Sequence, residues 1–252
     1  MKRKMWTLVQ TDFKKMNKYV FLLPFVSCAF VLLFASLSIK YNPVDEFPWE
    51  SYLLQMSTTC SIFLPISMTM ICSHIANSEH RYNMWKQTFT FPLRKSGIYF
   101  AKLIECIIAE IAFFVSLMIG FIFIGFIFLE TDVSLINLIL KVFVSLFIAY
   151  IPIIAFQLWL SLIIKNQAFP ISIGILLAIF SYTFYVFPFD IGRLLPWTFP
   201  SSVLPIQLVI DEAQNMSIIQ TTNPAMYVGL SLIVGALIIF ISMLHFTKRD
   251  IM

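Results

Sequence analysis

The sequence predicts an all-α integral membrane protein with six transmembrane helices, an N-terminal interfacial (elbow) helix and a short cytoplasmic helix. Of its 252 residues, 60% are hydrophobic and only 12% are charged, whereas soluble domains carry about 25% charged residues. The apolar residues form continuous blocks, each long enough to cross a hydrocarbon core of about 30 Å as a helix of about 20 residues. Continuous blocks exclude a transmembrane barrel, whose strands alternate in polarity. Because lipid offers the backbone no hydrogen-bond partners, the blocks must be helices.

Six apolar blocks are long enough to be spans, and together they form one transmembrane domain over residues 1–252. The predicted spans are residues 20–39, 51–76, 98–129, 135–164, 168–187 and 225–246. The third and fourth exceed the length that a membrane requires, so we expect their ends to protrude or the helices to tilt. No small-residue cleavage pattern follows the first block, and we therefore expect no cleavable signal peptide.

Positive charge is distributed unequally between the two sides of this arrangement. With the N-terminus inside, fourteen of the seventeen lysines and arginines lie on the cytoplasmic side, and Lys40, Lys141 and Arg193 lie outside. An excess of Lys and Arg marks the cytoplasmic loops of membrane proteins. The external acidic residues are Asp45, Glu46, Glu50, Glu130, Asp132, Asp190, Asp211 and Glu212. The sequence thus predicts a multi-pass protein of the cell membrane with both termini in the cytoplasm.

The first 19 residues have the pattern of an amphipathic helix. Its apolar residues recur at helical spacing and are Met5, Leu8, Val9, Phe13 and Met16. We expect residues 1–19 to lie in the inner membrane interface, where Trp6 is an anchor. The alternative is a frayed basic tail that only sets the topology.

The longest external segment is predicted to be residues 188–223. Its four prolines prevent one uninterrupted helix, and an apolar run extends from Val203 to Ile210. This run leaves two alternatives, which are short helices that dip back toward the membrane and an ordinary structured loop packed on the span ends.

Motifs of nucleotide hydrolysis and of hydrolytic enzymes are absent from the sequence. None of its seven glycines begins a phosphate-binding G-x-x-x-x-G-K-[ST] loop, so the chain cannot hydrolyse ATP by that route. G-x-S-x-G and H-E-x-x-H are absent as well. The four cysteines have the spacing of no metal site and no disulfide framework. We therefore expect no catalytic residue, metal or cofactor in this chain, and no binding of nucleic acid.

Three polar residues within the apolar blocks are candidates for a substrate pathway or an inner polar contact. Glu105 and Glu110 lie in the third block, and Gln157 lies near the inner end of the fourth. Ionisable groups inside a membrane are costly and usually face a partner or a polar cavity. Lys102 precedes Glu105 by three residues and could pair with it along the helix. A structural ion pair at the interface is therefore the alternative for Glu105, and also for Glu110. The alternative for Gln157 is an interhelical hydrogen bond.

The cytoplasmic segment 78–97 is a basic, aromatic-bearing insert between the second and third spans. Asn77 or Ser78 can cap a short helix there. The aromatic residues of that helix follow at i, i+3 and i+7 on one face and are Tyr82, Trp85 and Phe89. Such a helix can dock in a groove of a soluble partner, or it can lie on the lipid interface and contact no protein.

The run from Glu79 to Leu103, EHRYNMWKQTFTFPLRKSGIYFAKL, resembles the first cytoplasmic loop of ABC-2-type transporter permeases. That loop has an acidic residue, a tryptophan, a threonine-rich turn before a proline, a basic pair and a Y-x-x-K start of the third span. The matching residues are Glu79, Trp85, Thr88, Thr90, Pro92, Arg94, Lys95, Tyr99 and Lys102. The segment from Pro152 to Gly174 is similar to the junction of the fourth and fifth spans in the lantibiotic-immunity and bacitracin-type branch.

The resemblance implies that the insert is a coupling helix, which transmits motion from a separate ATPase subunit. It assigns the ATPase contact to Glu79, Arg81, Tyr82, Trp85, Lys86 and Phe89. The complex would hold two ABC ATPase copies, which bind ATP and Mg, and a second permease copy, identical or related. The chain would be the permease of a bacterial ABC exporter that expels amphipathic peptide antibiotics from the membrane, as in lantibiotic or bacteriocin immunity.

Two other functions remain open at this point. An ABC-2 exporter of a lipid, a drug or another cargo would have the same spans, because substrates that partition into the membrane leave no charged binding motif. A membrane sensor or assembly protein would bind a partner without moving a substrate, and it would need no ATPase.

Overall fold

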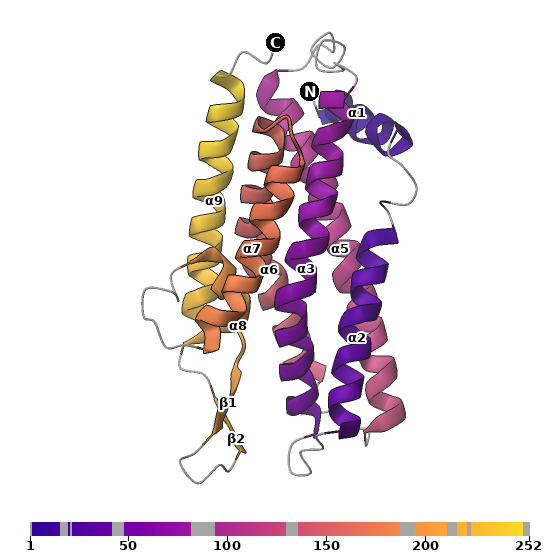
Figure 1. Ribbon diagram of the computed structural model, residues 1–252, viewed down its shortest axis with the longest axis vertical. Helices are drawn as coiled ribbons and strands as arrows, with labels where there is room; N and C mark the ends of the chain where they lie inside the picture. The colour runs from indigo at the N-terminus through magenta and orange to yellow at the C-terminus, as the bar shows by residue number, and fades with distance from the viewer. Residues whose placement is uncertain are drawn as a thin grey trace.

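The structure is a computed structural model. It describes residues 2–15, 20, 22–41, 48–81, 94–129, 136–186, 195–210, 216–220 and 223–248. Six long helices lie side by side along one axis and alternate in direction (Figure 1). They are α2 (Leu23–Tyr41), α3 (Pro48–Arg81), α5 (Lys95–Phe128), α6 (Ile136–Ile163), α7 (Ala168–Val186) and α9 (Pro224–Lys248).

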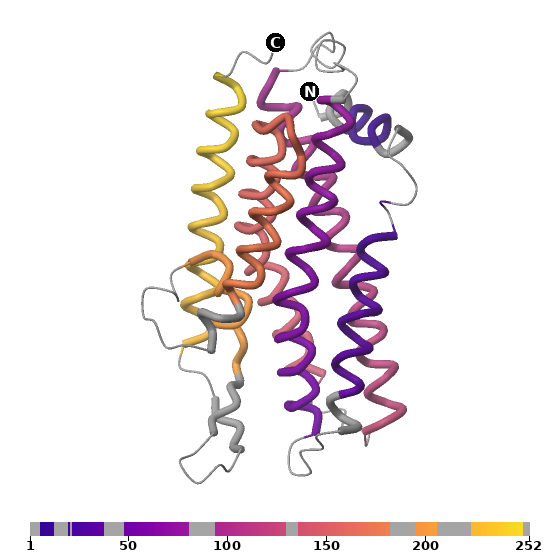
Figure 2. The backbone as a smooth tube through the Cα atoms, viewed as in Figure 1, coloured from indigo at the N-terminus to yellow at the C-terminus, as the bar shows by residue number. Residues whose placement is uncertain are grey.

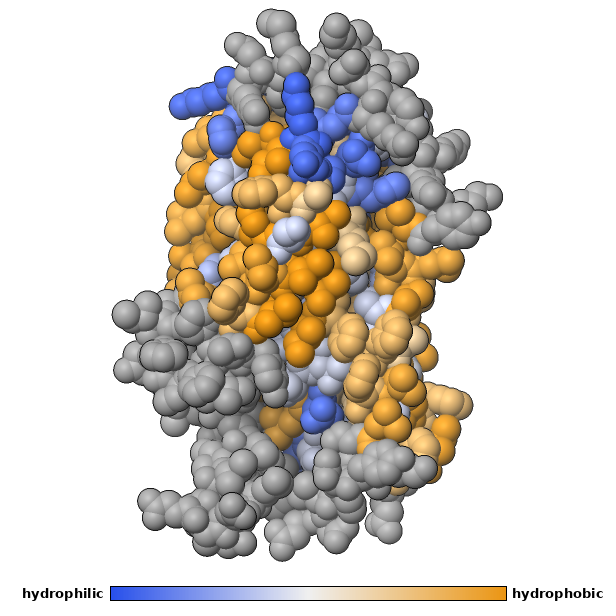
Figure 3. Space-filling view, in the orientation of Figure 1, coloured by the Kyte–Doolittle hydropathy of each residue, from blue (hydrophilic) through white to orange (hydrophobic). Residues whose placement is uncertain are grey.

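Four of these helices, α3, α5, α6 and α9, are long and apolar enough to cross a membrane. Within the described residues the apolar stretches of α2 and α7 are shorter, Leu23–Leu37 and Ala168–Ser181. Hydrophobic side chains cover the middle of the visible face (Figure 3). Ile119 and Phe123 on α5 and Ile233 on α9 are each more than 60% exposed. Such a continuous apolar surface would promote aggregation in water, and it suits contact with lipid.

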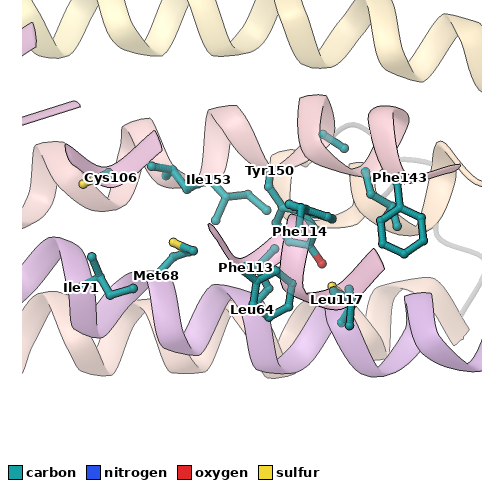
Figure 4. Close-up of a cluster of buried hydrophobic side chains, with 14 of the residues drawn as sticks. Leu64, Met68, Ile71, Cys106, Phe113, Phe114, Leu117, Phe143, Tyr150 and Ile153 are labelled. Carbon is teal, nitrogen blue, oxygen red and sulfur yellow. The ribbon is translucent and has the colours of Figure 1, made fainter. Parts of the chain in front are cut away.

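Helix α3 lies at the centre of the bundle and packs against α2, α5, α6 and α7. Its hydrophobic contacts with α5 and α6 include Leu64, Phe113 and Tyr150, all without solvent exposure (Figure 4). Helix α9 is peripheral, with most of its apolar surface turned outward. The backbone trace in Figure 2 shows α9 on one edge of the bundle and α2 on the other.

Polar hydroxyls inside α3 bond to the backbone of their own helix. The hydroxyls of Ser57, Thr58 and Thr59 donate to the carbonyl oxygens four residues earlier, at 2.7 to 2.8 Å. Because lipid and neighbouring apolar side chains offer no acceptor, this back-bonding satisfies the hydroxyls locally. The helix therefore tolerates a polar run without an interhelical partner.

Helix α1 (Lys2–Lys15) runs across the bundle axis at the end where α9 finishes (Figure 1). It packs against α5, and Leu8 and Val9 are each only 1% exposed. Trp6 is 52% exposed. The amphipathic pattern of this segment thus forms a helix. We call the end of the bundle that carries α1, Arg81 and Lys248 the α1 end.

Helix α3 continues to Arg81, so the prediction that Asn77 or Ser78 caps a new helix is wrong. The hydroxyl of Ser78 donates to the carbonyl oxygen of Ile75 at 2.7 Å, as in a continuing helix. The last turns of α3 contain no glycine or proline that would end it. The aromatic residues at 82, 85 and 89 lie outside the described residues.

The described part of residues 188–223 contains short helices that pack against the long ones, and the two alternatives for this segment both stay predictions. A 3-10 turn, η4 (Pro196–Thr198), leads into the short helix α8 (Phe199–Ser202), and both contact α6. Strands β1 (Ile206–Ile210) and β2 (Met216–Gln220) then form an antiparallel hairpin. The hairpin was not predicted. Within the described residues, the prediction of an all-α chain is wrong at these two strands. Their Ile and Val residues favour strands, but they also suit a membrane-facing helix.

Candidate functional site

Four charged residues form a buried charge cluster at the α1 end: Asp12, Glu79, Lys102 and Glu105. The Nζ atom of Lys102 lies 2.6 Å from Oδ2 of Asp12 and 2.9 Å from Oε1 of Glu79. It lies 3.9 Å from Oε2 of Glu105. The four side chains are at most 5% exposed. The first two distances are those of charge-assisted hydrogen bonds.

Three helices bring this cluster together. Asp12 follows the buried Leu8 of α1 by one turn, so both face α5. Glu79 lies in the last turns of α3, one turn beyond the buried Ile75. Lys102 and Glu105 lie one turn apart on the buried face of α5. The cluster therefore joins α1 to the helices that precede and follow residues 82–93.

Burial makes the ion pairs of the cluster depend on one another. A charge removed from water is strongly destabilising unless it is paired and hydrogen-bonded. Removing one partner of a buried ion pair typically costs about 3–5 kcal/mol, because the other charge is left uncompensated. Loss of Lys102 would leave three carboxylates without this ammonium group, so it is the residue on which the arrangement depends.

The structure places Glu79 inside the cluster, with 3% exposure, and not on the surface. Its contact with an ATPase, implied by the family resemblance, stays a prediction. Arg81 is the last residue of α3. The remaining residues assigned to that contact, Tyr82, Trp85, Lys86 and Phe89, lie outside the described residues.

The ion pair between Lys102 and Glu105, which the sequence offered as the structural alternative for Glu105, is present. Asp12 was missed, although it makes the shortest contact of the cluster. One signal in the sequence pointed to it. Asp12 is an acidic residue on the apolar face of an amphipathic helix, where a charge requires a partner.

Glu110 is fully buried in α5, and neither of its carboxyl oxygens has a hydrogen-bond partner among the described residues. It lies five residues beyond Glu105, or about 7.5 Å further along the helix at about 1.5 Å per residue. Cys72 of α3 and Tyr150 of α6 are among its neighbours. An unsatisfied buried polar group is costly and often marks a functional position. Its predicted part in a substrate pathway stays a prediction.

Gln157 joins α6 to α7. Its side-chain Nε2 donates to the carbonyl oxygen of Pro170 at 2.9 Å, and the side chain is 1% exposed. This is an interhelical hydrogen bond of the kind that the sequence offered as the alternative. The hydrogen bond accounts for the burial of Gln157. The place of Gln157 in a substrate pathway stays a prediction.

Further polar contacts link the long helices. They are Ser73 with Ser161 at 3.3 Å, Cys72 with Cys106 at 3.4 Å, Tyr99 with Ser242 at 2.5 Å and Trp159 with His245 at 3.2 Å. The four cysteines are buried and free. In the part of the chain that the structure describes, no group of three or more His, Cys, Asp or Glu side chains is placed to hold a metal ion.

An apolar groove of about 320 Å³ opens on the outer surface between α5 and α6. Its lining residues are Ile111, Phe114, Val115, Met118, Leu140, Phe143, Val144 and Phe147. Phe114, only 6% exposed, forms its inner wall and contacts Tyr150 with ring centroids 5.9 Å apart. The groove suits hydrocarbon and offers no charged group.

The long apolar helices, their exposed hydrophobic surface and the charged α1 end define a multi-pass helical membrane protein. Residues 8–181, more than two thirds of the chain, match the sequence model described as ABC-2 family transporter protein. The chain therefore belongs to the ABC-2 family of transporter membrane proteins, which confirms the family predicted from the sequence. No curated protein matches the chain significantly.

The matched range contains the charge cluster, Glu110, Gln157 and the segment 82–93. The ABC-2 membrane domain is a permease and has no ATPase domain of its own. Such permeases generally pair with an ABC ATPase. The hairpin and α9 follow the matched range.

Proposed function

We propose that this chain is the permease subunit of a bacterial ABC exporter that expels amphipathic peptide antibiotics from the membrane, as in lantibiotic or bacteriocin immunity. Two copies of a separate ATPase would bind ATP and Mg, and a second permease copy, identical or related, would complete the transporter. The proposal is supported mainly by the match to the ABC-2 family. The sequence has no phosphate-binding loop, in agreement with that match. Such a permease requires an ATPase in another chain.

In this proposal all six long helices cross the membrane, and the α1 end is cytoplasmic. The start of α1 and the end of α9 lie at that same end of the bundle (Figure 1). Polar side chains gather there on the visible face (Figure 3). This arrangement agrees with the excess of Lys and Arg that the sequence assigns to the cytoplasmic side.

The segment 82–93 is the proposed contact with the ATPase, together with Glu79 and Arg81 at the end of α3. Because α3 ends and α5 begins at the α1 end, displacement of this segment acts on both helices at once. Alternating access requires two discrete packings of the helices. ATP binding would favour one packing, and release after hydrolysis would restore the other.

The proposed cargo partitions into the bilayer before it is exported. The apolar groove between α5 and α6 and the exposed hydrophobic faces support a route open to lipid. Glu110 is the proposed inner polar contact for a basic group of the peptide, since its carboxyl oxygens have no hydrogen bond among the described residues.

Replacing Trp85 by Ala tests the coupling contact. The chain is purified from the cell membrane in which it is produced, and both the amount of ATPase that purifies with it and the protection of the cells against peptide antibiotics are measured. We expect Trp85→Ala to lose one or both. The matched control is Phe123→Ala, another aromatic truncation, at a position 66% exposed on the hydrophobic surface. Unchanged binding and protection in Trp85→Ala would contradict the coupling role.

The cargo is tested separately with a deletion strain and a panel that contains nisin, bacitracin, cationic drugs and detergents. We expect increased susceptibility to the peptide antibiotics, restored by the wild-type gene. Susceptibility to drugs alone would favour another ABC-2 cargo. A purified chain that retains no ATPase would favour the membrane sensor or assembly protein.

A further inference from the structure

We propose that Asp12 and Lys102 are positioning residues of the ATP-driven cycle, and that they carry motion of the segment 82–93 into helix α1. The inference rests on the proposed function, because it takes an ATPase to act on that segment. It adds a moving element, α1, and a residue, Asp12, that the assignment of the ATPase contact does not include.

An ion pair connects the two helices that flank the segment 82–93. Glu79 lies three residues before the segment, and Lys102 lies nine residues after it. Their side chains meet at 2.9 Å. A displacement of the segment therefore acts on α3 and α5 through the backbone and through this ion pair.

Helix α1 receives the motion through its packing on α5. Leu8 and Val9 are buried there, and Asp12 bonds Lys102 at 2.6 Å. Apolar contacts between helices can slide by small steps. A buried charge pair must keep its partner, so Asp12 follows Lys102 when the inner part of α5 moves.

Glu105 gives the cluster a second arrangement. At 3.9 Å from Lys102 it is beyond hydrogen-bond length in this structure, but it lies one turn away on the same helix and moves with Lys102. When Glu79 separates from Lys102, Glu105 can take the vacated donor of the ammonium group, while Asp12 stays paired with it. The lysine then remains paired in both states, which is the property of a two-state element.

The decisive measurement is hydrogen exchange of the permease–ATPase complex in lipid, with and without ATP and vanadate. In the wild type we expect the nucleotide to change the protection of both the segment 82–93 and α1. In Asp12→Ala we expect the nucleotide to change the exchange of the segment 82–93 as in the wild type. We expect the change in the exchange of α1 to be smaller by about 5-fold or more, because coupling between sites typically amounts to at least about 5-fold. Gln10→Ala, at an exposed position of α1, is the matched control.

An unchanged response of α1 in Asp12→Ala would overturn the inference. So would a nucleotide response in the wild type that stops at α5. We further expect Lys102→Arg to keep the response of α1, because a guanidinium group can pair with the same carboxylates.

A second measurement uses the permease without an ATPase. The temperatures of unfolding of Asp12→Ala, Lys102→Met and the double variant form a double-mutant cycle. We expect the double variant to be less destabilised than the sum of the single variants, because the first substitution already removes the contact. Additive effects would overturn the proposed contact. Failure of the wild-type chain to retain any ATPase would instead overturn the proposed function, while the cycle still tests the ion pair.

Discussion

Lys102 shows how a single side chain can organise the end of a helical bundle. Three carboxylates from three helices surround its ammonium group, and the side chain is 1% exposed. Lysine has three donors and a flexible stem, so it can serve these partners at the same time or exchange them. Ion pairs of this kind are weak evidence for net stability. Their value here lies in specifying which helices meet.

Glu110 differs from these carboxylates. Its carboxyl group is buried and accepts no hydrogen bond from the described residues, so the cost of removing it from water is not offset there. We predict that Glu110→Leu raises the temperature of unfolding, since an unsatisfied buried polar group costs about 1–3 kcal/mol. We also predict that it reduces export, in keeping with the proposed polar contact. Both are measured on the same preparation, by thermal unfolding and by ATP-driven transport into vesicles.

Gln157→Leu is the control for Glu110→Leu, and its effect on stability has the opposite sign. It removes the hydrogen bond to the carbonyl oxygen of Pro170, and we expect a loss of about 1 kcal/mol. A lower unfolding temperature for Glu110→Leu would mean that the Glu110 carboxyl has a stabilising partner, and it would contradict the first prediction.

At the scale of elements, the packing of α7 depends on one close approach. A Cβ atom added at Gly174 would overlap the side chain of Thr69 on α3 and lie 2.9 Å from Oε1 of Gln157 on α6. A residue without a side chain thus lets three helices meet at this crossing. Small residues have this role in many membrane helix interfaces.

Gly174→Ala is predicted to destabilise the protein by about 1–3 kcal/mol, the usual cost of overpacking. Gly229→Ala on α9 is the matched control, because no atom lies within 4 Å of its added Cβ. There we expect no loss, and a gain of up to about 1 kcal/mol from helix propensity. Thermal unfolding of both variants measures the difference. Equal effects at the two positions would contradict the close approach.

At the scale of the whole molecule, the helices sort polar and apolar surface along the bundle axis. Hydrophobic side chains cover the middle of the visible face (Figure 3). The buried charge cluster lies at the α1 end, between α1, the last turns of α3 and the start of α5. This distribution supports the proposed orientation, in which the α1 end and both termini are cytoplasmic.

The orientation predicts which positions a membrane-impermeant maleimide reaches in intact cells. Cysteine substituted for Asn223, exposed before α9, is expected to react from outside. Cysteine substituted for Arg94, exposed before α5, is expected to react only after the cells are permeabilised. The four native cysteines are buried and give a low background. The reverse pattern of labelling would contradict the orientation.

Local sequence patterns were sufficient for the class and the family of this protein. Apolar blocks of about 20 residues predict membrane helices without knowledge of the fold, and helices lie over each predicted span. Residues 79–103 pointed to the ABC-2 family. Periodicity did not predict the strand at residues 206–210. A short apolar run with β-branched residues suits a helix or a strand, and its pairing with residues 216–220 makes it a strand here.

The sequence by itself determined that this is a helical ABC-2 membrane protein, because composition and local order carry that information. It also offered the pair between Lys102 and Glu105, which are three residues apart. Only the tertiary structure decided that Asp12, 90 residues from Lys102, completes the cluster, and that Gln157 bonds the start of α7. Similar apolar side chains cover every long helix, so the sequence pattern does not specify which faces meet. The packing of whole helices places these polar groups together.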